Sequence, residues 1–380
     1  MNKNPLFEIG IYGQSIWFDT LSRELAASGG LQKLIDDYAV VGVTSNPTIF
    51  QKAISGSQDY DQDIRHLAEK GQTAAQIFEK LETDDVRMAC DVLAPVYERT
   101  EGVDGRVSIE VSPQLAFKTQ ETMQDARRLW KTVDRPNLMV KIPGTHEGIP
   151  AIEQMLYEGL SINITLLFAV SMYEKVMEAY LKAMERRATD GKPLDGIHSV
   201  ASFFVSRVDT MVDKELQARL SATSSPAEQA RLKGLLGKAA NANAKQAYQA
   251  FLRVFKGPRW EALKSKGANL QRPLWASTST KNPAYSDTMY VSELIGQHTV
   301  NTMPEETMLA FADHGEVRGL TVEEDLQGVR QALKELGEVG IDMEDITGRR
   351  LVDEGVQKFA DSYKVLLDEL RKKRDTVVTR

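Results

Sequence analysis

Eight short segments of apolar or β-branched residues recur along the chain, and most are separated by segments with helical periodicity. They are residues 15–20, 39–45, 106–112, 138–143, 161–168, 198–206, 273–278 and 299–304. Such runs are typical of strands that helices cover on both faces of a parallel sheet. The alternation of strand and helix predicts the α/β class. Eight strands predict closure into a (β/α)8 TIM barrel, whose active site would lie at the carboxyl ends of the strands.

An open, doubly wound sheet is the alternative that the same alternation allows. That fold usually carries a glycine-rich turn directly after its first strand. Here the first predicted strand runs into residues 19–25, which contain no glycine. The sequence therefore favours the closed barrel.

The connections between the strands predict how the rest of the chain is organised. We expect residues 1–380 to form one barrel domain, with helical insertions at about 46–105 and 207–272 and a C-terminal helical extension at about 321–372. The last helix should pack on the barrel through one apolar stripe. The stripe comprises Val352, Val356, Phe359, Tyr363, Leu367 and Leu370. Only the basic end, residues 371–380, is expected to fray.

Three segments predict where helices begin. In the first insertion, a helix is expected to start near Thr83. In the second, Ser225-Pro226-Ala227-Glu228 combines an N-cap serine, a proline at the first helical position and a glutamate three residues after the cap. Thr321-Val322-Glu323-Glu324 has the pattern of another capping box after the last strand.

The composition is that of a soluble globular protein: 380 residues, 42% hydrophobic, with a net charge of −7. The acidic balance argues against a nucleic-acid partner. A single cysteine, Cys90, excludes a disulfide framework and a site of several thiolates, and the five histidines show no metal-binding spacing. We find no apolar signal segment at the N-terminus and no apolar run of the ~18 residues that a membrane span requires. We therefore expect a cytoplasmic protein without a metal, a cofactor or a membrane partner.

Lys141 is the residue whose surroundings most suggest chemistry. It lies inside the predicted strand Leu138-Met139-Val140-Lys141-Ile142-Pro143, and lysines are almost never fully buried unless they are paired. One interpretation is a lysine at a strand end whose ammonium group reaches solvent. The other is a Schiff-base lysine, because burial disfavours the ammonium form and leaves an amine that can attack a carbonyl.

Two carboxylates and four further polar residues share the same end of the predicted barrel. Asp19 ends the first strand and Glu110 lies within the third. Either could instead be a salt-bridge partner, and Asp19 could cap a helix that begins at Thr20. The further residues, for which hydrogen bonding at strand ends is the alternative, are Thr44, Asn46, Asn163 and Thr165.

These residues belong to motifs that resemble those of the transaldolases, which are Schiff-base enzymes of the aldolase type. The resemblance extends from about Trp17 to about Asn301. Its motifs are Phe18-Asp19-Thr20, Thr44-Ser45-Asn46-Pro47, Ser108-Ile109-Glu110-Val111, Val140-Lys141-Ile142-Pro143, Asn163-Ile164-Thr165-Leu166-Leu167-Phe168 and Phe204-Val205-Ser206-Arg207. The segment Ala276–Asn282 is similar to the family's phosphate-binding segment, with Lys281 where many members have arginine. The insertion at 207–272 resembles the larger bacterial subgroup.

The resemblance implies a role for each candidate residue. Lys141 would attack the ketone of a ketose phosphate, and Asp19 would take the proton of the hydroxyl on the departing carbon. Glu110 would move protons through a water held by Thr165. The iminium ion withdraws electrons, so that neither a metal nor a cofactor is required. The implied substrate-binding residues are Thr44, Asn46 and Asn163 for hydroxyls, Ser202 and Phe204 for the pocket wall, and Arg207, Lys281 and Ser277 or Ser279 for phosphate.

The implied activity is the transfer of a dihydroxyacetone unit between sugar phosphates in the pentose phosphate pathway. A related enzyme that releases free dihydroxyacetone is one alternative. In such aldolases glutamine and tyrosine stand where this chain has Glu110 and Phe204, so the sequence favours transfer. A barrel that serves only as a binding module is another alternative, but it would have no reason to keep Lys141, Asp19 and Thr165 together. We expect sugar phosphates as partners, and the sequence leaves a homodimer open.

Overall fold

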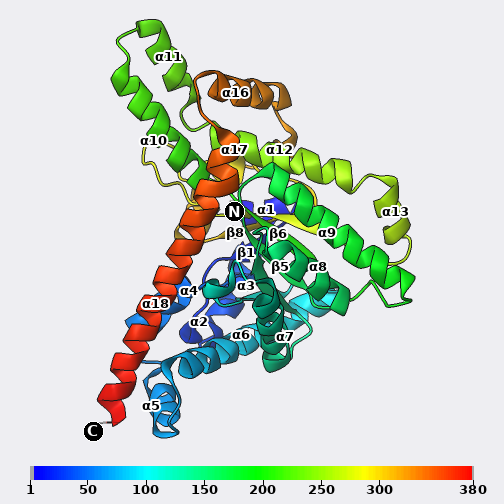
Figure 1. Ribbon diagram of the computed structural model, residues 1–380, viewed down its shortest axis with the longest axis vertical. Helices are drawn as coiled ribbons and strands as arrows, with labels where there is room; N and C mark the ends of the chain where they lie inside the picture. The colour runs from blue at the N-terminus through cyan, green and yellow to red at the C-terminus, as the bar shows by residue number, and fades with distance from the viewer. Residues whose placement is uncertain (1–3, 379–380) are drawn as a thin grey trace.

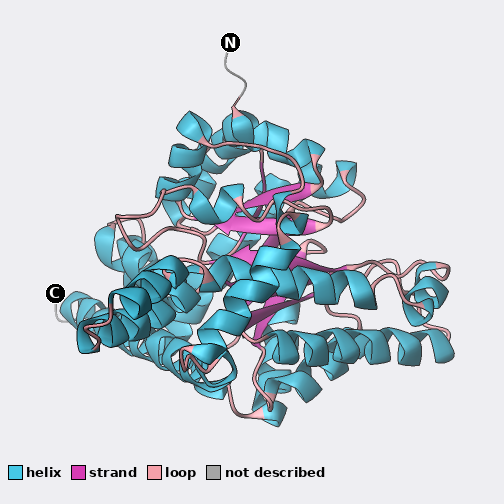
Figure 2. Ribbon diagram, turned by 90° about the horizontal axis from the view of Figure 1, so that it is seen from above, coloured by secondary structure: helices cyan, strands magenta, loops and turns pink. Residues whose placement is uncertain are grey.

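The computed structural model describes residues 4–378 and contains a closed barrel of eight parallel strands. Neighbouring strands pair in chain order, and the last strand closes on the first. The strands are β1 (Gln14–Phe18), β2 (Val40–Val43), β3 (Arg106–Glu110), β4 (Leu138–Pro143), β5 (Ile162–Leu167), β6 (Ser199–Phe204), β7 (Gln271–Ala276) and β8 (Thr299–Met303). In Figure 2 they cross the centre of the molecule and are enclosed by helices. The predicted (β/α)8 TIM barrel is confirmed, and the open sheet is excluded.

The helices form the outer layer and the connections. Those of the first half are α1 (Pro5–Ile11), α2 (Arg23–Ala27), α3 (Gly30–Tyr38), α4 (Pro47–Gly56), α5 (Asp61–Glu69), α6 (Ala74–Arg99), the 3₁₀ turn η1 (Pro113–Leu115), α7 (Thr119–Val133), α8 (Gly148–Glu158) and α9 (Val170–Thr189). Those of the second half are α10 (Ser206–Ala222), α11 (Pro226–Leu235), α12 (Ala239–Val254), α13 (Pro258–Lys264), α14 (Met289–Ser292), α15 (Glu305–His314), the 3₁₀ turn η2 (Thr321–Glu323), α16 (Leu326–Glu338), α17 (Met343–Asp345), the π-helical turn η3 (Ile346–Arg350) and α18 (Leu351–Val378). None of the helices in this described part of the chain is long and apolar enough to cross a membrane.

The predicted helix start near Thr83 is wrong. Helix α6 begins at Ala74, and Thr73 and Gln76 form a reciprocal capping box at its N-terminus. Thr83 lies within the helix, where its hydroxyl donates a hydrogen bond to the Glu79 carbonyl at 2.7 Å. A threonine inside a helix can donate to a carbonyl of the preceding turn in this way. The acidic residues that follow it resemble the first turn of a new helix, which explains the wrong prediction.

The start at Ser225 is confirmed, and the start at Thr321 is wrong. The Ser225 hydroxyl accepts a hydrogen bond from the Glu228 N–H at the start of α11. Thr321 instead begins the short turn η2, because its hydroxyl accepts a hydrogen bond from the Ile295 N–H. The following helix, α16, is capped by Asp325.

Helix α18 runs along one side of the barrel, from α17 to a position beside α4 and α5 (Figure 1). Phe359 and Leu370 of the predicted apolar stripe are buried on its inner face, and the other members of the stripe pack partly buried against the core. Leu366, which the stripe did not include, is also buried. The expected fraying after residue 370 is wrong as far as Val378, because the helix continues to that residue. Lys373 accounts for part of this, since its ammonium group contacts the Ile54 carbonyl and Asp61. Residues 379–380 lie outside the described residues.

Large side chains and a buried ion pair fill the barrel at the amino ends of its strands. Asp104 accepts hydrogen bonds from Trp17 Nε1 and from Arg272, both at 3.1 Å. The indole ring of Trp17 lies against Gly42 of β2, where a Cβ atom would come within 2.6 Å of the ring. The barrel interior is therefore packed around Trp17, and the polar positions at the carboxyl ends of the strands remain for chemistry.

Gly42→Ala should destabilise the protein by about 1–3 kcal/mol, because a buried methyl group would force the indole of Trp17 out of its packed position. The measurement is chemical denaturation followed by tryptophan fluorescence. Gly234→Ala is the matched control, since Gly234 lies in α11 with nothing within 4 Å of an added Cβ. That change should be neutral or stabilising. Equal stability of the Gly42→Ala variant and the wild type would contradict this account of the packed end.

Candidate active site

A cavity of about 1030 Å³ opens at the carboxyl ends of the strands. Its wall is formed by strand ends, the N-terminal part of α10, helix α4 and helix α18. All predicted site residues line it except Glu110 and Asn163, which are buried behind the wall. The lining members of the predicted set are Asp19, Thr44, Asn46, Lys141, Thr165, Ser202, Phe204, Arg207, Ser277, Ser279 and Lys281.

Lys141 extends into the barrel and not to solvent. Strand register places it between Glu110 on β3 and Asn163 on β5. Its Nζ lies 3.1 Å from Glu110 Oε2 and donates a hydrogen bond to the Ser45 carbonyl at 2.9 Å. The side chain is only 6% exposed, so a buried carboxylate and a carbonyl replace the water around the amine.

Asp19 and Glu110 are two carboxyl groups near this amine, Glu110 buried and Asp19 partly exposed at the cavity. Burial raises the pKa of Asp19, and the nearby Lys141 charge and the Thr44 hydroxyl lower it by less. Burial likewise raises the pKa of Glu110 against the opposing effect of Lys141. Asp19 caps no helix, because Ser22 caps α2. Its Oδ1 instead accepts a hydrogen bond from the Thr44 hydroxyl at 2.9 Å.

Thr165 and Glu110 each have a buried oxygen without a hydrogen-bond partner among residues 4–378. These atoms are Thr165 Oγ1 and Glu110 Oε2, the latter 3.1 Å from Lys141 Nζ. Beside Thr165 the register between β5 and β6 shifts, and Leu166 adopts a positive φ of 59°. Bulges of this kind are frequent next to active sites, where they redirect side chains.

The two asparagines are placed differently. Asn46 lies on the cavity wall, and its side-chain oxygen caps α4 by accepting the Ile49 N–H at 3.1 Å. Asn163 lies behind the wall, with its amide donating to Ser108 at 3.0 Å and its oxygen accepting from Ser202 at 2.7 Å. Asn163 therefore orients the Ser202 hydroxyl, while Asn46 directly faces the cavity.

Arg207 and Lys281 bring positive charge to one side of the cavity. Arg207 Nη1 is buried and has no hydrogen-bond partner in the described part of the chain. The guanidinium lies 5.2 Å from the centre of the Phe204 ring, and burial lowers its pKa. Lys281 donates to the Ser279 hydroxyl, and Ser277 shares a 2.9 Å hydrogen bond with Ser206. Arginine and lysine next to serine hydroxyls form a suitable environment for a phosphate group.

Buried aspartates of α10 hold the loop that carries these serines. Asp213 accepts the Tyr285 hydroxyl at 2.6 Å, and Asp209 accepts the Tyr290 hydroxyl at 2.9 Å. Burial raises the pKa of Asp209 to about 6. The segment that follows β7 is thereby tied to the helix that begins with Ser206 and Arg207.

Four contributors to the site are not predicted from the sequence. The Ser45 carbonyl contacts Lys141, and a backbone carbonyl leaves no signal in a sequence. Thr302 on β8 contacts the Thr44 hydroxyl at 2.7 Å, and its place at the end of a predicted strand could have revealed it. Lys52 and Lys358 also line the cavity. These lysines come from α4 and α18, and no motif in the local sequence indicates that they line a cavity.

A second cavity, of about 720 Å³, lies at the amino ends of the strands and contains none of the predicted site residues. Nor do residues 4–378 bring together three histidine, cysteine, aspartate or glutamate side chains as ligands for a metal ion.

Comparison with known proteins gives consistent matches over almost the whole chain. The family model described as transaldolase/fructose-6-phosphate aldolase matches residues 16–370. A transaldolase of Mycobacterium marinum is 51% identical over 378 residues, which cover 99% of each chain. One from Mycobacterium bovis is 50% identical over 376 residues, or 98% of each chain. One from Parafrankia is 48% identical over 367 residues, or 97% of each chain.

Proposed function

The chain belongs to the transaldolase/fructose-6-phosphate aldolase family of enzymes, and from that premise we propose that it transfers dihydroxyacetone units through a Schiff base on Lys141. The donor is sedoheptulose 7-phosphate or fructose 6-phosphate. The acceptor is glyceraldehyde 3-phosphate or erythrose 4-phosphate. This reaction would place the enzyme in the pentose phosphate pathway of the cytoplasm. The observation that carries the proposal is the buried amine of Lys141, which lies 3.1 Å from Glu110 Oε2 and lines the same cavity as Asp19.

The first step joins Lys141 to the ketone carbon of the donor. The neutral amine attacks the carbon and then gives up a proton, and the resulting carbinolamine takes up a proton at its hydroxyl and expels water to give an iminium ion. Glu110 is close enough to take the proton from Nζ and to return it to the departing hydroxyl. Thr165, whose hydroxyl has no other partner within residues 4–378, holds the water through which the proton passes.

The second step breaks the carbon–carbon bond. Asp19 takes the proton of the hydroxyl two carbons from the iminium carbon. The bond between the intervening carbon and the hydroxyl-bearing carbon then opens, and its electron pair moves into the iminium system. The products are an aldehyde, which leaves, and a three-carbon enamine, which stays bound to Lys141. Addition of a second aldehyde reverses these events, with Asp19 returning the proton.

The remaining side chains hold the substrate. Asn46 binds hydroxyls of the three-carbon unit, and Asn163 acts through the Ser202 hydroxyl that it orients. Thr44 holds the carboxylate of Asp19. Arg207, Lys281 and Ser279 bind the phosphate. Ser279 is included because Lys281 already donates a hydrogen bond to its hydroxyl. Ser277 shapes the same loop through its bond to Ser206. The proposed reaction uses neither a metal nor a cofactor.

Transfer and release can be compared in one experiment. With fructose 6-phosphate and erythrose 4-phosphate, the wild type should form sedoheptulose 7-phosphate much faster than it frees dihydroxyacetone without an acceptor. Phe204→Tyr should raise the released share several-fold, because its hydroxyl can donate a proton where the phenylalanine cannot. The measurement is coupled detection of both products. Phe117→Tyr, at an exposed site, should change nothing.

Two outcomes would contradict the proposal. Release by the wild type as fast as transfer would identify a releasing aldolase. Absence of both products would identify a different reaction.

The acid limb of the pH profile of kcat/KM should reflect Asp19, which must be ionised to accept a proton. Because burial raises the pKa of Asp19 and the Thr44 hydroxyl opposes that rise, Thr44→Val should move the limb to higher pH. Activity should then be lower at acidic pH and largely retained on the alkaline side. Thr48→Val is the matched control, since that hydroxyl lines the cavity but bonds Ser362. A limb that stays in place, or moves to lower pH, would exclude Asp19 as the base.

A further inference from the structure

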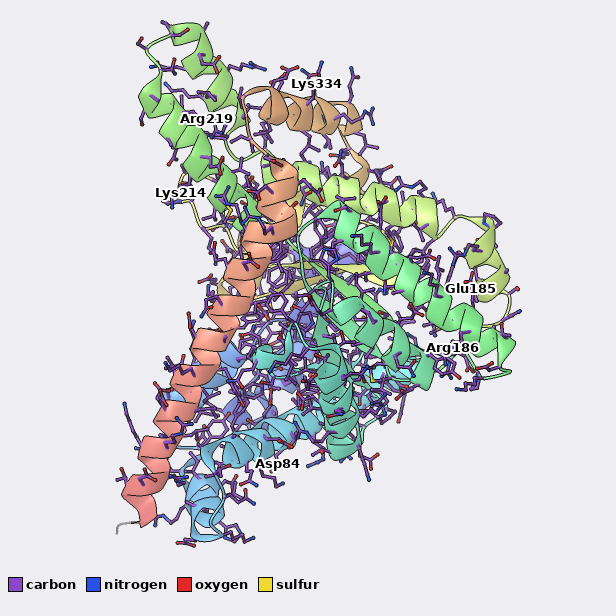
Figure 3. The ribbon with its side chains drawn as sticks, viewed as in Figure 1. Asp84, Glu185, Arg186, Lys214, Arg219 and Lys334 are labelled. Atoms are coloured by element: carbon purple, nitrogen blue, oxygen red, sulfur yellow. The ribbon has the colours of Figure 1, made fainter. Side chains whose placement is uncertain are left out.

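Besides Lys141, basic side chains from five separate elements line the cavity that Arg207 enters, including Arg350 of η3, which is paired with Glu215. Arg207 lies in the first turn of α10, and Lys281 lies in the loop after β7. Lys52 comes from α4, and Lys358 comes from α18. All four line the same cavity. Lys214, labelled in Figure 3, lies on the same wall but two turns further along α10 than Arg207.

The C-terminal helix is held close to Arg207 by a glycine. An added Cβ at Gly355 would lie 2.9 Å from the Leu166 side chain and 3.4 Å from Arg207 Nη1. A larger residue would require the Leu166 side chain to move, so the glycine favours this close approach. Lys358 follows three residues later, and residues with that spacing share one face of a helix. Helix α18 therefore presents Lys358 on the face that approaches Arg207.

The charges around Lys358 are mostly of its own sign. The charge of Arg207 is the largest cause that lowers the pKa of Lys358, and burial, Lys281 and Lys52 act in the same direction. Glu354 is the acidic group that opposes them. Like charges gathered at one wall repel each other unless an anion lies between them. A phosphate group is the anion that the proposed substrates would bring to this place.

We propose that Lys358 is a further phosphate-binding residue and helps the site to prefer phosphorylated over unphosphorylated substrates. The proposal rests on the function proposed above and extends it from the strand ends to the C-terminal helix. The phosphate would be bound from one side by Arg207 and Lys281 and from the other by Lys358. Because the Lys358 side chain is exposed to solvent at the cavity, its contribution should be moderate, about fivefold in affinity, as for a solvated ion pair at the upper end of its range.

The test uses the full chain and inorganic phosphate as the probe, titrated by calorimetry. Lys358→Met should weaken phosphate binding about fivefold, and Lys358→Arg should preserve it. Lys364→Met is the matched control, because Lys364 is exposed on the same helix and does not line the cavity. In kinetics, Lys358→Met should raise KM for fructose 6-phosphate about fivefold and leave kcat nearly unchanged. The kcat/KM for unphosphorylated fructose should not change.

Two results would overturn the role of Lys358. One is unchanged phosphate affinity in Lys358→Met. The other is an equal loss with fructose and fructose 6-phosphate, which would show that α18 merely shapes the cavity. The calorimetric titration needs no catalysis, so it tests Lys358 even if no dihydroxyacetone transfer is found. Conversely, normal transfer with an unaffected phosphate titration would remove this proposal alone and leave the proposed function standing.

Discussion

The site depends on one constraint, the burial of a lysine amine inside the barrel. An unpaired ammonium group in such surroundings would be very costly. Strand β4 places Lys141 opposite Glu110 of β3, and the Ser45 carbonyl supplies a second partner. Asp19 lines the same cavity as Lys141, and burial raises its pKa. The buried lysine therefore accounts for the buried carboxyl group of Glu110, and in the proposed reaction these three groups exchange protons with the bound sugar.

The barrel converts this local pairing into a site. Eight parallel strands end at one rim, so that side chains distant in sequence converge there. The bulge at Leu166 and the close approach of Gly355 then bring helix α18 onto the same rim. Buried aspartates of α10 hold the loop after β7. Helices α10 and α18, which the chain adds to the barrel, thus form part of the cavity wall as well as part of the outer layer.

The sequence predicted most of the fold because strands enclosed by helices consist of near-continuous apolar runs, a signal that survives without tertiary information. Helix starts were less predictable: Thr83 and Thr321 resemble caps locally, but their hydroxyls bond Glu79 and Ile295. The motifs identified Lys141 and Asp19 because chemistry limits the residue types there. The Ser45 carbonyl and Lys358 could not be predicted in this way. Their roles arise from backbone position and from the packing of a distant helix, which no local pattern encodes.

Borohydride reduction would reveal whether Lys141 forms the covalent intermediate. The enzyme is incubated with fructose 6-phosphate, reduced, digested and examined by mass spectrometry. The peptide containing Lys141 should gain the mass of one reduced dihydroxyacetone unit, and Lys141→Met should gain none. Lys52, Lys281 and Lys358 serve as internal controls because they line the same cavity. An adduct on one of these lysines, or no adduct on Lys141 during active transfer, would contradict the account.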